Sequence, residues 1–223
     1  MKKDLKIGCI IMASGVSKRF GANKLLVKFQ GKSLVQRTLD LTAGELFGKR
    51  LVLTRTPEVA EICERQNVSV ICHNLSERRE AIKLGVDVMS EMDGILFCPC
   101  DQPLLSQESL SRMVQAFHEK AVKKRERAED APENEAIKVQ ETFREHFIKW
   151  ILRLSCENEV GAPVLFGSKY FEELKNLPEH CGGSWLIKKY PENLVKIQAV
   201  YKWELFDIDT KEDLEFLEKQ VMK

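Results

Sequence analysis

Cationic residues, among them Arg19 and Lys24, lie together with several small residues in one short segment near the N-terminus. The segment IGCIIMASGVSKRFGANKLL begins as an apolar run and continues into Ser14, Gly15, Ser17, Arg19 and Lys24. Small residues let a loop at the end of a strand approach a ligand closely, so that backbone amides can bind phosphate oxygens. Arg19 and Lys24 could neutralise the remaining phosphate charge. The segment therefore indicates a phosphate-binding loop, with an ordinary polar loop as the alternative.

Two familiar phosphate-binding motifs are absent from the sequence. Gly31-Lys32-Ser33 resembles the end of a Walker A loop, but that motif requires a glycine where the chain has Leu26. Gly15 and Gly21 do not have the spacing of the dinucleotide-binding glycine pattern. The sequence therefore predicts neither a P-loop nor a Rossmann dinucleotide site.

Aspartates end two further apolar runs. Asp101 lies in the segment ILFCPCDQPLL, and Asp207 and Asp209 lie in ELFDIDT. Open α/β sheets bind ligands at the carboxyl ends of their strands. Mg²⁺ accepts a few carboxylates and fills its other positions with water and substrate phosphate. Asp101 and Asp209 are therefore candidate Mg²⁺ ligands, although each alone could equally be a strand-end or helix-cap aspartate.

The histidines and the paired cysteines give weaker signals. His73 follows an apolar run and is better interpreted as a strand-end hydrogen-bonding residue than as a ligand. His118 and His146 lie in charged helical sequence and are expected to be solvated. Cys98 and Cys100 lack the second pair that a structural zinc site needs, so we interpret both as residues of a pocket wall.

The elements that must position these residues alternate between strand and helix. Short runs rich in Val, Ile and Leu, separated by helical patterns, are typical of parallel strands covered on both sides by helices. The sequence therefore predicts an α/β fold of three layers, with a mostly parallel sheet between helices. The expected strands are 5–13, 50–54, 68–72, 94–98, 151–156, 163–166, 194–199 and 203–206. The expected helices are 33–47, 57–66, 77–89, 106–120, 169–176 and one that starts at Thr210, where Asp213 completes a capping pair.

The segment 118–149 interrupts this alternation. It is dense in charge of both signs and contains Pro132. At its end and directly after it, large apolar residues recur at spacings that would line one face of a helix, namely Phe143, Phe147, Trp150 and Ile151. We expect a solvated helical insertion within one domain that spans 1–223. The alternative is a docking surface for a partner or substrate.

Composition and charge exclude several classes of protein. The chain has 223 residues, with 35 Lys and Arg against 34 Asp and Glu, which argues against a nucleic-acid partner bound mainly by bulk charge. A hydrophobic content of 43% is enough for a sizeable core and excludes disorder of the whole chain. Apolar runs are too short for a membrane helix or a signal peptide. The seven cysteines, most of them within apolar runs, favour a reduced, cytoplasmic setting.

Four segments, in this order, resemble the nucleotidyltransferases of the molybdenum cofactor cytidylyltransferase type. The opening pattern of that family, Ala-Ala-Gly-x-Ser-x-Arg-Met-Gly-x-x-Lys, has its counterpart at 13–24. Asp-Gln-Pro-Leu stands at 101–104, Gly-x-Pro-Val-Leu-Phe at 161–166 and Asp-Ile-Asp-Thr at 207–210. The resemblance covers nearly the whole chain except the insertion.

The resemblance implies a nucleotide-diphospho-sugar transferase-like fold that binds a magnesium nucleotide over the loop after the first strand. It implies that Arg19 and Lys24 are the catalytic cations on the triphosphate and that Asp101 and Asp209 hold Mg²⁺. The other nucleotide-binding residues that it implies are Ala13, Ser14, Gly15, Ser17 and Cys100. Ala13-Ser14-Gly15 is closer to the Ala-Ala-Gly of cytidylyl members than to the Ala-Gly-Gly of guanylyl members, which favours CTP over GTP.

The acceptor side departs from the family pattern. Gly161-Ala162-Pro163 stands where relatives carry Gly-His-Pro, and 179–184 stands where they carry Gly-Asp-x-Gly-Ala-Arg. The implied acceptor-binding residues are Gly161, Pro163 and His180. The loop before the third helix is shorter than in the family. It brings Arg78, Arg79 and Ala81 near the place where relatives contact the base.

The implied reaction is transfer of CMP from CTP to a phosphate of molybdopterin, with release of pyrophosphate. A terminal phosphate is largely ionised near neutrality, so the reaction requires no general base. One alternative is a cytidylyltransferase for another phosphorylated acceptor, such as a sugar or polyol phosphate. Another is a molybdenum cofactor chaperone that binds nucleotide and serves a client molybdoenzyme.

Overall fold

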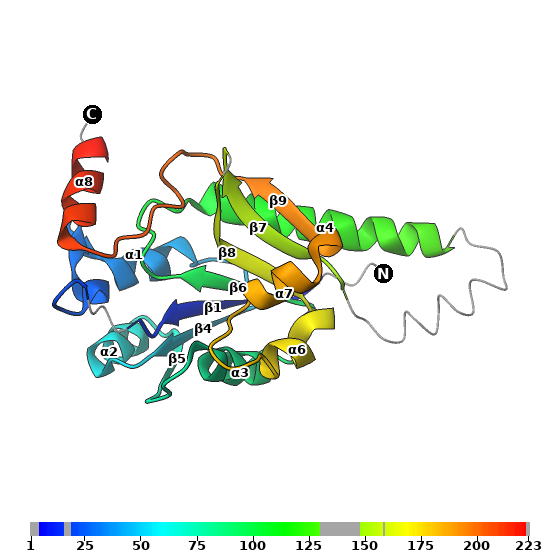
Figure 1. Ribbon diagram of the computed structural model, residues 1–223, viewed down its shortest axis with the longest axis horizontal. Coiled ribbons are helices and arrows are strands. Elements are labelled where there is room, and N and C mark those ends of the chain that lie inside the picture. The colour runs from blue at the N-terminus through cyan, green and yellow to red at the C-terminus, as the bar shows by residue number, and fades with distance from the viewer. Residues whose placement is uncertain (1–4, 16–18, 130–147, 158, 222–223) are drawn as a thin grey trace.

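A seven-stranded sheet organises the chain, in the order β5-β4-β1-β6-β8-β7-β9 (Figure 1). The computed structural model describes residues 5–15, 19–129, 148–157 and 159–221. β8 runs antiparallel to β6 and to β7, and all the other neighbours in the sheet are parallel. The predicted mostly parallel sheet is therefore confirmed. The strands are β1 (Ile7–Ala13), β4 (Lys49–Thr54), β5 (Ser69–Cys72), β6 (Gly94–Pro99), β7 (Ile151–Cys156), β8 (Glu159–Gly167) and β9 (Leu194–Gln198).

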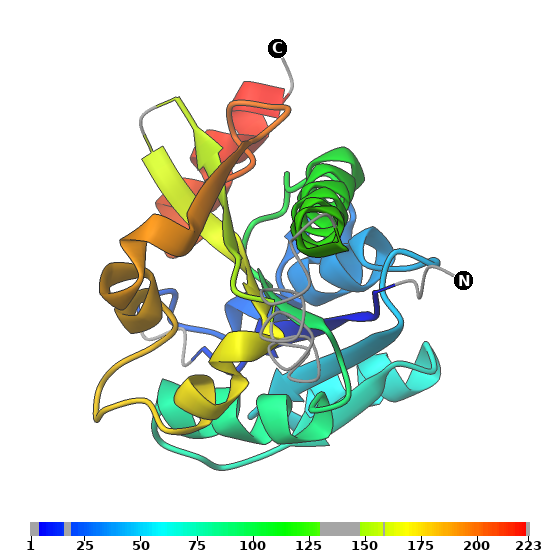
Figure 2. The same cartoon turned by 90° about the vertical axis from the view of Figure 1, so that its right-hand side faces the viewer.

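Helices cover both faces of the sheet and complete three layers (Figure 2). One face carries α1 (Leu34–Leu41), α2 (Pro57–Arg65) and α4 (Gln107–Glu129). The other carries α3 (Arg78–Val88), α6 (Phe171–Lys175) and α7 (Ser184–Lys189). The C-terminal helix α8 (Lys211–Val221) packs on a smaller cluster with the hairpin of β2 (Lys28–Phe29) and β3 (Lys32–Ser33). Short 3-10 turns lie at η1 (Lys24–Leu26), η2 (Ser168–Tyr170) and η3 (Pro191–Asn193).

The central strand β1 explains why the expected strands have no polar face. Cys9 and Ile11 pack toward α1, α2 and α4, whereas Ile10 between them packs toward α3. Successive side chains of a strand point to opposite faces, so a strand covered on both sides is apolar throughout. The three-layer prediction from continuous apolar runs is confirmed by this alternation. None of the helices in the described part of the chain is long and apolar enough to cross a membrane.

The helix expected at 33–47 is shorter than predicted. Ser33 caps its start by accepting a hydrogen bond from the backbone amide of Gln36, and the helix ends at Leu41. Gly44 has a φ of +93°, a conformation that a right-handed helix does not contain. The apolar residues that follow the helix therefore belong to a turn.

The strand expected at 203–206 is not formed. Trp203 packs edge to face against Phe206 and against Phe216 of α8, with ring centroids 6.0 Å and 5.5 Å apart. Glu204 between them is buried and accepts hydrogen bonds from Ser106 and from the backbone amide of Tyr201. The apolar pattern that predicted a strand belongs instead to an aromatic cluster on a turn.

The expected insertion divides into two parts. Residues 118–129 continue α4, which extends well beyond the sheet (Figure 1). Residues 130–147, which include Pro132, Phe143 and Phe147, lie outside the described residues. Ile151 is the first residue of β7, so the prediction that it lines a helix face is wrong.

The contact between α4 and β6 gives a test of the core. A Cβ atom on Gly94 would lie 2.7 Å from Cζ and 2.9 Å from Cε1 of the buried Phe117. We expect Gly94→Ala to lower the free energy of unfolding by about 1–3 kcal/mol, because a packed core has no room for an added methyl group. Urea denaturation measures the change. The matched control is Gly48→Ala, where the nearest atom is the carbonyl oxygen of Ile7 at 3.9 Å. Equal unfolding free energies for Gly94→Ala and the wild type would contradict this packing.

Candidate active site

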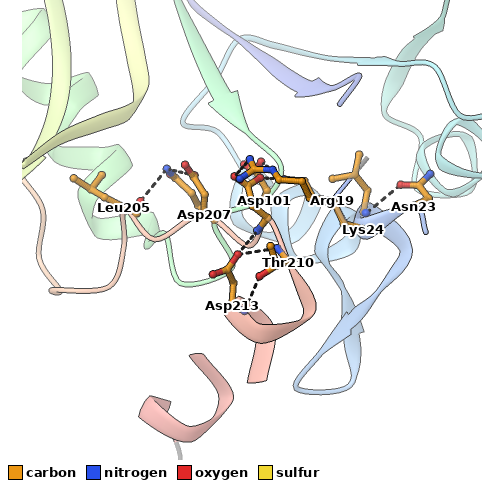
Figure 3. A network of polar contacts seen from close by, with 11 residues as sticks. Arg19, Asn23, Lys24, Asp101, Leu205, Asp207, Thr210 and Asp213 are labelled. Atoms are coloured by element: carbon orange, nitrogen blue, oxygen red, sulfur yellow. Dashed lines mark hydrogen bonds and ion pairs between the residues drawn. The ribbon is translucent and has the colours of Figure 1, made fainter. Parts of the chain in front are cut away.

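A buried lysine joins two aspartates that are far apart in the sequence (Figure 3). The ammonium nitrogen of Lys24 lies 2.8 Å from Oδ2 of Asp101 and 2.8 Å from Oδ1 of Asp209. The two carboxylate oxygens are thus separated by at most twice that distance. Arg19 donates from Nη2 to the other oxygen of Asp209, at 2.6 Å. The three segments with candidate chemistry therefore meet at one point.

The motif residues themselves bring Asp101 and Asp209 together. Asp101 follows β6, and its carbonyl oxygen accepts a hydrogen bond from the amide of Ile208 at 2.9 Å. Gln102 is buried and donates to Asp207 Oδ1 at 2.9 Å. The Asp-Gln pair after β6 thus aligns the Asp-Ile-Asp segment beside it, with Asp209 on the side of Lys24.

Helix capping fixes Asp209. Oδ2 of Asp213 accepts hydrogen bonds from the amides of Asp209 and Thr210, at 3.0 Å and 2.7 Å. The hydroxyl of Thr210 accepts from the amide of Asp213 at 3.1 Å. The predicted capping pair at the start of α8 is confirmed. It satisfies the first-turn amide of Asp213 and holds the backbone of Asp209 in place.

Asn23 fixes the approach of Lys24. Its side-chain oxygen accepts from the amide of Leu25 at 3.1 Å and caps η1. Its amide nitrogen donates to the hydroxyl of Thr56 at 3.0 Å. The lysine is therefore carried on a turn that is tied to the end of β4, and only 7% of its side chain is exposed.

The charges at this point shift one another's pKa values. Burial acts to lower the pKa of the Lys24 ammonium, but the contacts with Asp101 and Asp209 outweigh it, so the pKa is raised. The hydrogen bond from Lys24, together with Arg19, lowers the pKa of Asp209. Desolvation and the nearby Asp101 carboxylate raise the pKa of Asp207. Near neutral pH, Lys24 is thus a fixed cation and Asp209 a fixed anion.

A cleft of about 400 Å³ opens above this cluster, within the range of small-ligand sites. One part of its lining carries the charged cluster and the loop after β1, with Ser14, Gly15, Arg19, Lys24, Asp101 and Asp209. The other part comes from the ends of β4 and β5 and the start of α3, with Arg55, His73, Ser76, Glu77, Arg78 and Ala81. The cleft therefore lies at the carboxyl edge of the parallel strands.

Two of the candidate nucleotide-binding residues do not line this cleft. Ala13 is buried at the end of β1. Cys100 is also buried, and burial raises the pKa of its thiol far above the usual range. Cys98 lies in the same core cluster, so the interpretation of both cysteines as pocket-wall residues is wrong. Their side chains belong to the layer between β6 and the helices. Ser17 lies outside the described residues.

The candidate acceptor residues lie near the cleft without lining it. Gly161 and Pro163 belong to β8, in which Val164 pairs with Phe97. They therefore lie at the same edge of the sheet as the end of β6. His180 is exposed, and its backbone amide donates to Oε2 of the cleft residue Glu77 at 3.4 Å.

Several cleft residues did not emerge from the sequence. Arg55, Ser76 and Glu77 belong to none of the motifs identified in the sequence. His73 was assigned only a local hydrogen-bonding role. Their common signal is position, because each follows a parallel strand at the edge where such sheets bind ligands. Arg78 and Ala81 do line the cleft, whereas Arg79 pairs with Glu77 at 2.7 Å and with Glu179 at 3.5 Å.

The carboxylate pair fits a hard divalent cation that is shared with a substrate. Within the described ranges, no group of three or more His, Cys, Asp or Glu side chains could hold a metal on its own. Mg²⁺ is commonly bound through one or two carboxylates plus substrate phosphates. Asp101 and Asp209 supply those oxygen donors at one point of the cleft.

Comparison with known proteins agrees with this geometry. The family profile described as the MobA-like NTP transferase domain matches residues 9–194. This chain belongs to the MobA-like NTP transferase family. A probable molybdenum cofactor guanylyltransferase of Aquifex aeolicus is 23% identical over 209 residues, which cover 92% of this chain and 87% of that protein. The chain is therefore a nucleotidyltransferase, and its relatives include proteins named as probable molybdenum cofactor guanylyltransferases.

Solved structures of nucleotidyltransferases share the fold. A nucleotidyl transferase of Methanothermobacter thermautotrophicus superposes with a TM-score of 0.72 at 19% identity, over 97% of this chain and 98% of that one. A cytidylyltransferase of Leptospira borgpetersenii has a TM-score of 0.66 at 18% identity, over 98% and 87% of the two chains. The expected nucleotide-diphospho-sugar transferase-like fold is confirmed.

The bridge between the aspartates gives a test by titration. We expect Asp209 to titrate below about 3.9 in the wild type. In Lys24→Met it should titrate at a higher pH, because the two carboxylates then lack the ammonium between them. Carboxyl ¹³C NMR measures both values. Since the pKa is depressed in the folded state, the contact stabilises the protein above the unfolded carboxyl pKa, and that contribution is lost as the pH falls through the folded pKa.

The control for this titration is Lys32→Met, which removes an exposed lysine paired with Asp40. It should leave the titration of Asp209 unchanged. The proposed bridge would be refuted by a pKa of Asp209 that is the same in Lys24→Met and in the wild type.

Proposed function

We propose that this protein transfers CMP from CTP to a phosphate of a molybdopterin-type acceptor and releases pyrophosphate. The observation that carries the proposal is the Lys24 bridge between Asp101 and Asp209 at one end of the cleft. Such a cluster combines a fixed cation for phosphate oxygens with two carboxylates for a metal. Membership of the MobA-like family and relatives named for the molybdenum cofactor support the choice of acceptor.

Arg19 and Lys24 are the proposed contacts of the triphosphate. Because its pKa is raised, the Lys24 ammonium keeps its charge at all physiological pH values. The Arg19 side chain is 71% exposed, so its guanidinium can reach a ligand in the open part of the cleft. The amide of Gly15 lies in the loop after β1, where a backbone of small residues can approach phosphate oxygens.

Asp101 and Asp209 would hold Mg²⁺, which when bound neutralises phosphate charge and so assists displacement at phosphorus. The chain's own contribution is the fixed geometry of these carboxylates, set by the Gln102–Asp207 hydrogen bond and by the cap at Thr210. Such preorganised groups stabilise developing charge without rearranging during the reaction.

The proposed reaction is a direct displacement at the α-phosphorus. An oxygen of the acceptor phosphate forms a bond to that phosphorus while the bond to the bridging oxygen of the β-phosphate breaks. Pyrophosphate leaves with the electron pair of the broken bond. The acceptor phosphate has a second pKa of about 6 and is mostly dianionic at neutral pH, so no side chain has to remove a proton. Alignment and charge stabilisation by Arg19 and Lys24 are the protein's main contributions.

The loop sequence Ala13-Ser14-Gly15 supports cytosine as the base, whereas the Aquifex aeolicus relative is named a guanylyltransferase. The assay therefore compares all four nucleoside triphosphates, each with Mg²⁺ and molybdenum cofactor. We expect pyrophosphate release and a cytidylylated cofactor, detected by mass spectrometry, from CTP. Product from GTP instead would overturn the choice of base, and product from a sugar or polyol phosphate but not from the cofactor would overturn the acceptor.

Two variants separate chemistry from folding in the same assay. Asp101→Asn should lower the turnover number by orders of magnitude, because it removes one carboxylate charge and keeps the shape. Asp40→Asn, on an exposed aspartate outside the cleft, should leave turnover near the wild-type value. Binding of CTP without any pyrophosphate from any acceptor would contradict the enzymatic proposal and favour a chaperone.

A further inference from the structure

A chain of hydrogen bonds connects the ends of β1, β4 and β5 at the part of the cleft that is lined by Arg55 and His73. Nε2 of His73 lies 2.8 Å from the hydroxyl of Ser14, and that hydroxyl lies 2.9 Å from the carbonyl oxygen of Leu53. On the other side of the ring, Nδ1 of His73 accepts from the amide of Leu75 at 3.2 Å. Arg55 donates to the carbonyl oxygen of Leu75. Ser14, Arg55 and His73 all line the cleft.

Each of these hydrogen bonds has only one possible donor and one possible acceptor. A backbone amide can only donate, so Nδ1 of His73 carries no proton and the neutral ring has its proton on Nε2. A carbonyl oxygen can only accept, so the Ser14 hydroxyl donates its single proton to Leu53. Nε2 of His73 therefore donates to the oxygen of Ser14.

This direction fixes the chemistry that Ser14 presents. Its oxygen has given its proton to Leu53 and has one lone pair engaged by His73, so it can offer a ligand only its second lone pair. An acceptor of this kind complements an exocyclic amino group, which cytosine and guanine both carry. It does not complement the O4 oxygen of uracil, which can only accept.

We infer that His73 is a positioning residue that, as its neutral Nε2–H tautomer, holds Ser14 as a hydrogen-bond acceptor at the base end of the cleft. The cleft then selects a nucleotide with an amino-bearing base over UTP. The inference rests on the proposed function, because the part of the cleft lined by the ends of β4 and β5 is the base end only if Arg19 and Lys24 are the triphosphate contacts.

Protonation of His73 would disrupt this series of hydrogen bonds. A proton on Nδ1 would face the amide proton of Leu75, and neither group could accept. Burial and the charge of Arg55, at the end of β4, lower the pKa of His73, whereas Glu80 on α3 acts to raise it. The arrangement with neutral His73 is therefore intact above the ordinary histidine pKa of about 6.5. It is lost as the pH falls through the pKa of His73 in the folded protein, which is lower.

Calorimetric titration with CTP, GTP and UTP in the presence of Mg²⁺ tests this role. We expect His73→Leu to weaken binding of the amino-bearing nucleotide by about tenfold, the effect of one lost hydrogen bond. Its affinity for UTP should change much less. His73→Gln retains a side-chain amide that can donate to Ser14 and cannot titrate. At pH 8 it should bind within about threefold of the wild type.

The pH profile separates positioning from a general structural effect. The terminal phosphate of the nucleotide itself takes up a proton at about pH 6. Because this affects both proteins equally, the informative quantity is the ratio of wild-type to His73→Gln affinity. We expect that ratio to fall as the pH is lowered from 8 through the depressed pKa of His73 in the folded protein, because only the wild type loses its donor arrangement. The control His118→Gln, on α4, should follow the wild-type profile.

The possible failures are distinguishable. Binding of none of the nucleotides by the wild type would overturn the proposed function, and the inference with it. Preference for GTP over CTP would overturn the choice of base alone. Unchanged affinity in His73→Leu, a constant ratio for His73→Gln across the pH range, or equal binding of UTP would overturn the role of His73 while leaving the proposed function intact.

Discussion

The buried ammonium of Lys24 is the constraint on which the site depends. A cation with so little exposure would be unfavourable alone, and the two carboxylates on it compensate the loss of its hydration. The same contacts connect the turn after β1, the end of β6 and the start of α8. Loss of any one partner would leave a charge uncompensated in the cleft. The folding of these segments and the balance of their charges therefore depend on each other.

The sheet supplies the rest of the geometry. Parallel strands end at a common edge, and four of the elements that line the cleft begin where β1, β4, β5 and β6 stop. One end of this edge carries the charged cluster and the other carries the neutral hydrogen-bond chain through His73. The cleft is thus divided between groups suited to a polyanion and groups with fixed donor and acceptor roles. A nucleoside triphosphate has the same division.

The strands and the individual residues of the charged cluster could be predicted because their signals are local, whereas the meeting of Asp101 and Asp209 was implied only by the family resemblance. Continuous apolar runs define β1 and β6, and the candidate residues Gly15 and Asp101 follow them within two positions. The prediction failed where long-range packing decided the outcome. Trp203 and Phe206 form an aromatic cluster with α8 instead of a strand. Cys100 precedes Asp101 but faces the core, since neighbouring residues of an extended chain point to opposite sides. The bond between Ser14 and His73 joins residues 59 positions apart, and no local pattern indicates it.

The central claim is that Asp101 and Asp209 act together on one divalent ion. Electron paramagnetic resonance with Mn²⁺ as a spectroscopic substitute, in the presence of CTP, measures how much ion each variant binds. We predict that Asp101→Asn and Asp209→Asn each weaken Mn²⁺ binding by roughly tenfold or more. The control Asp40→Asn, on an exposed aspartate outside the cleft, should stay within about threefold of the wild type. Wild-type Mn²⁺ affinity in either Asp101→Asn or Asp209→Asn would contradict the shared site.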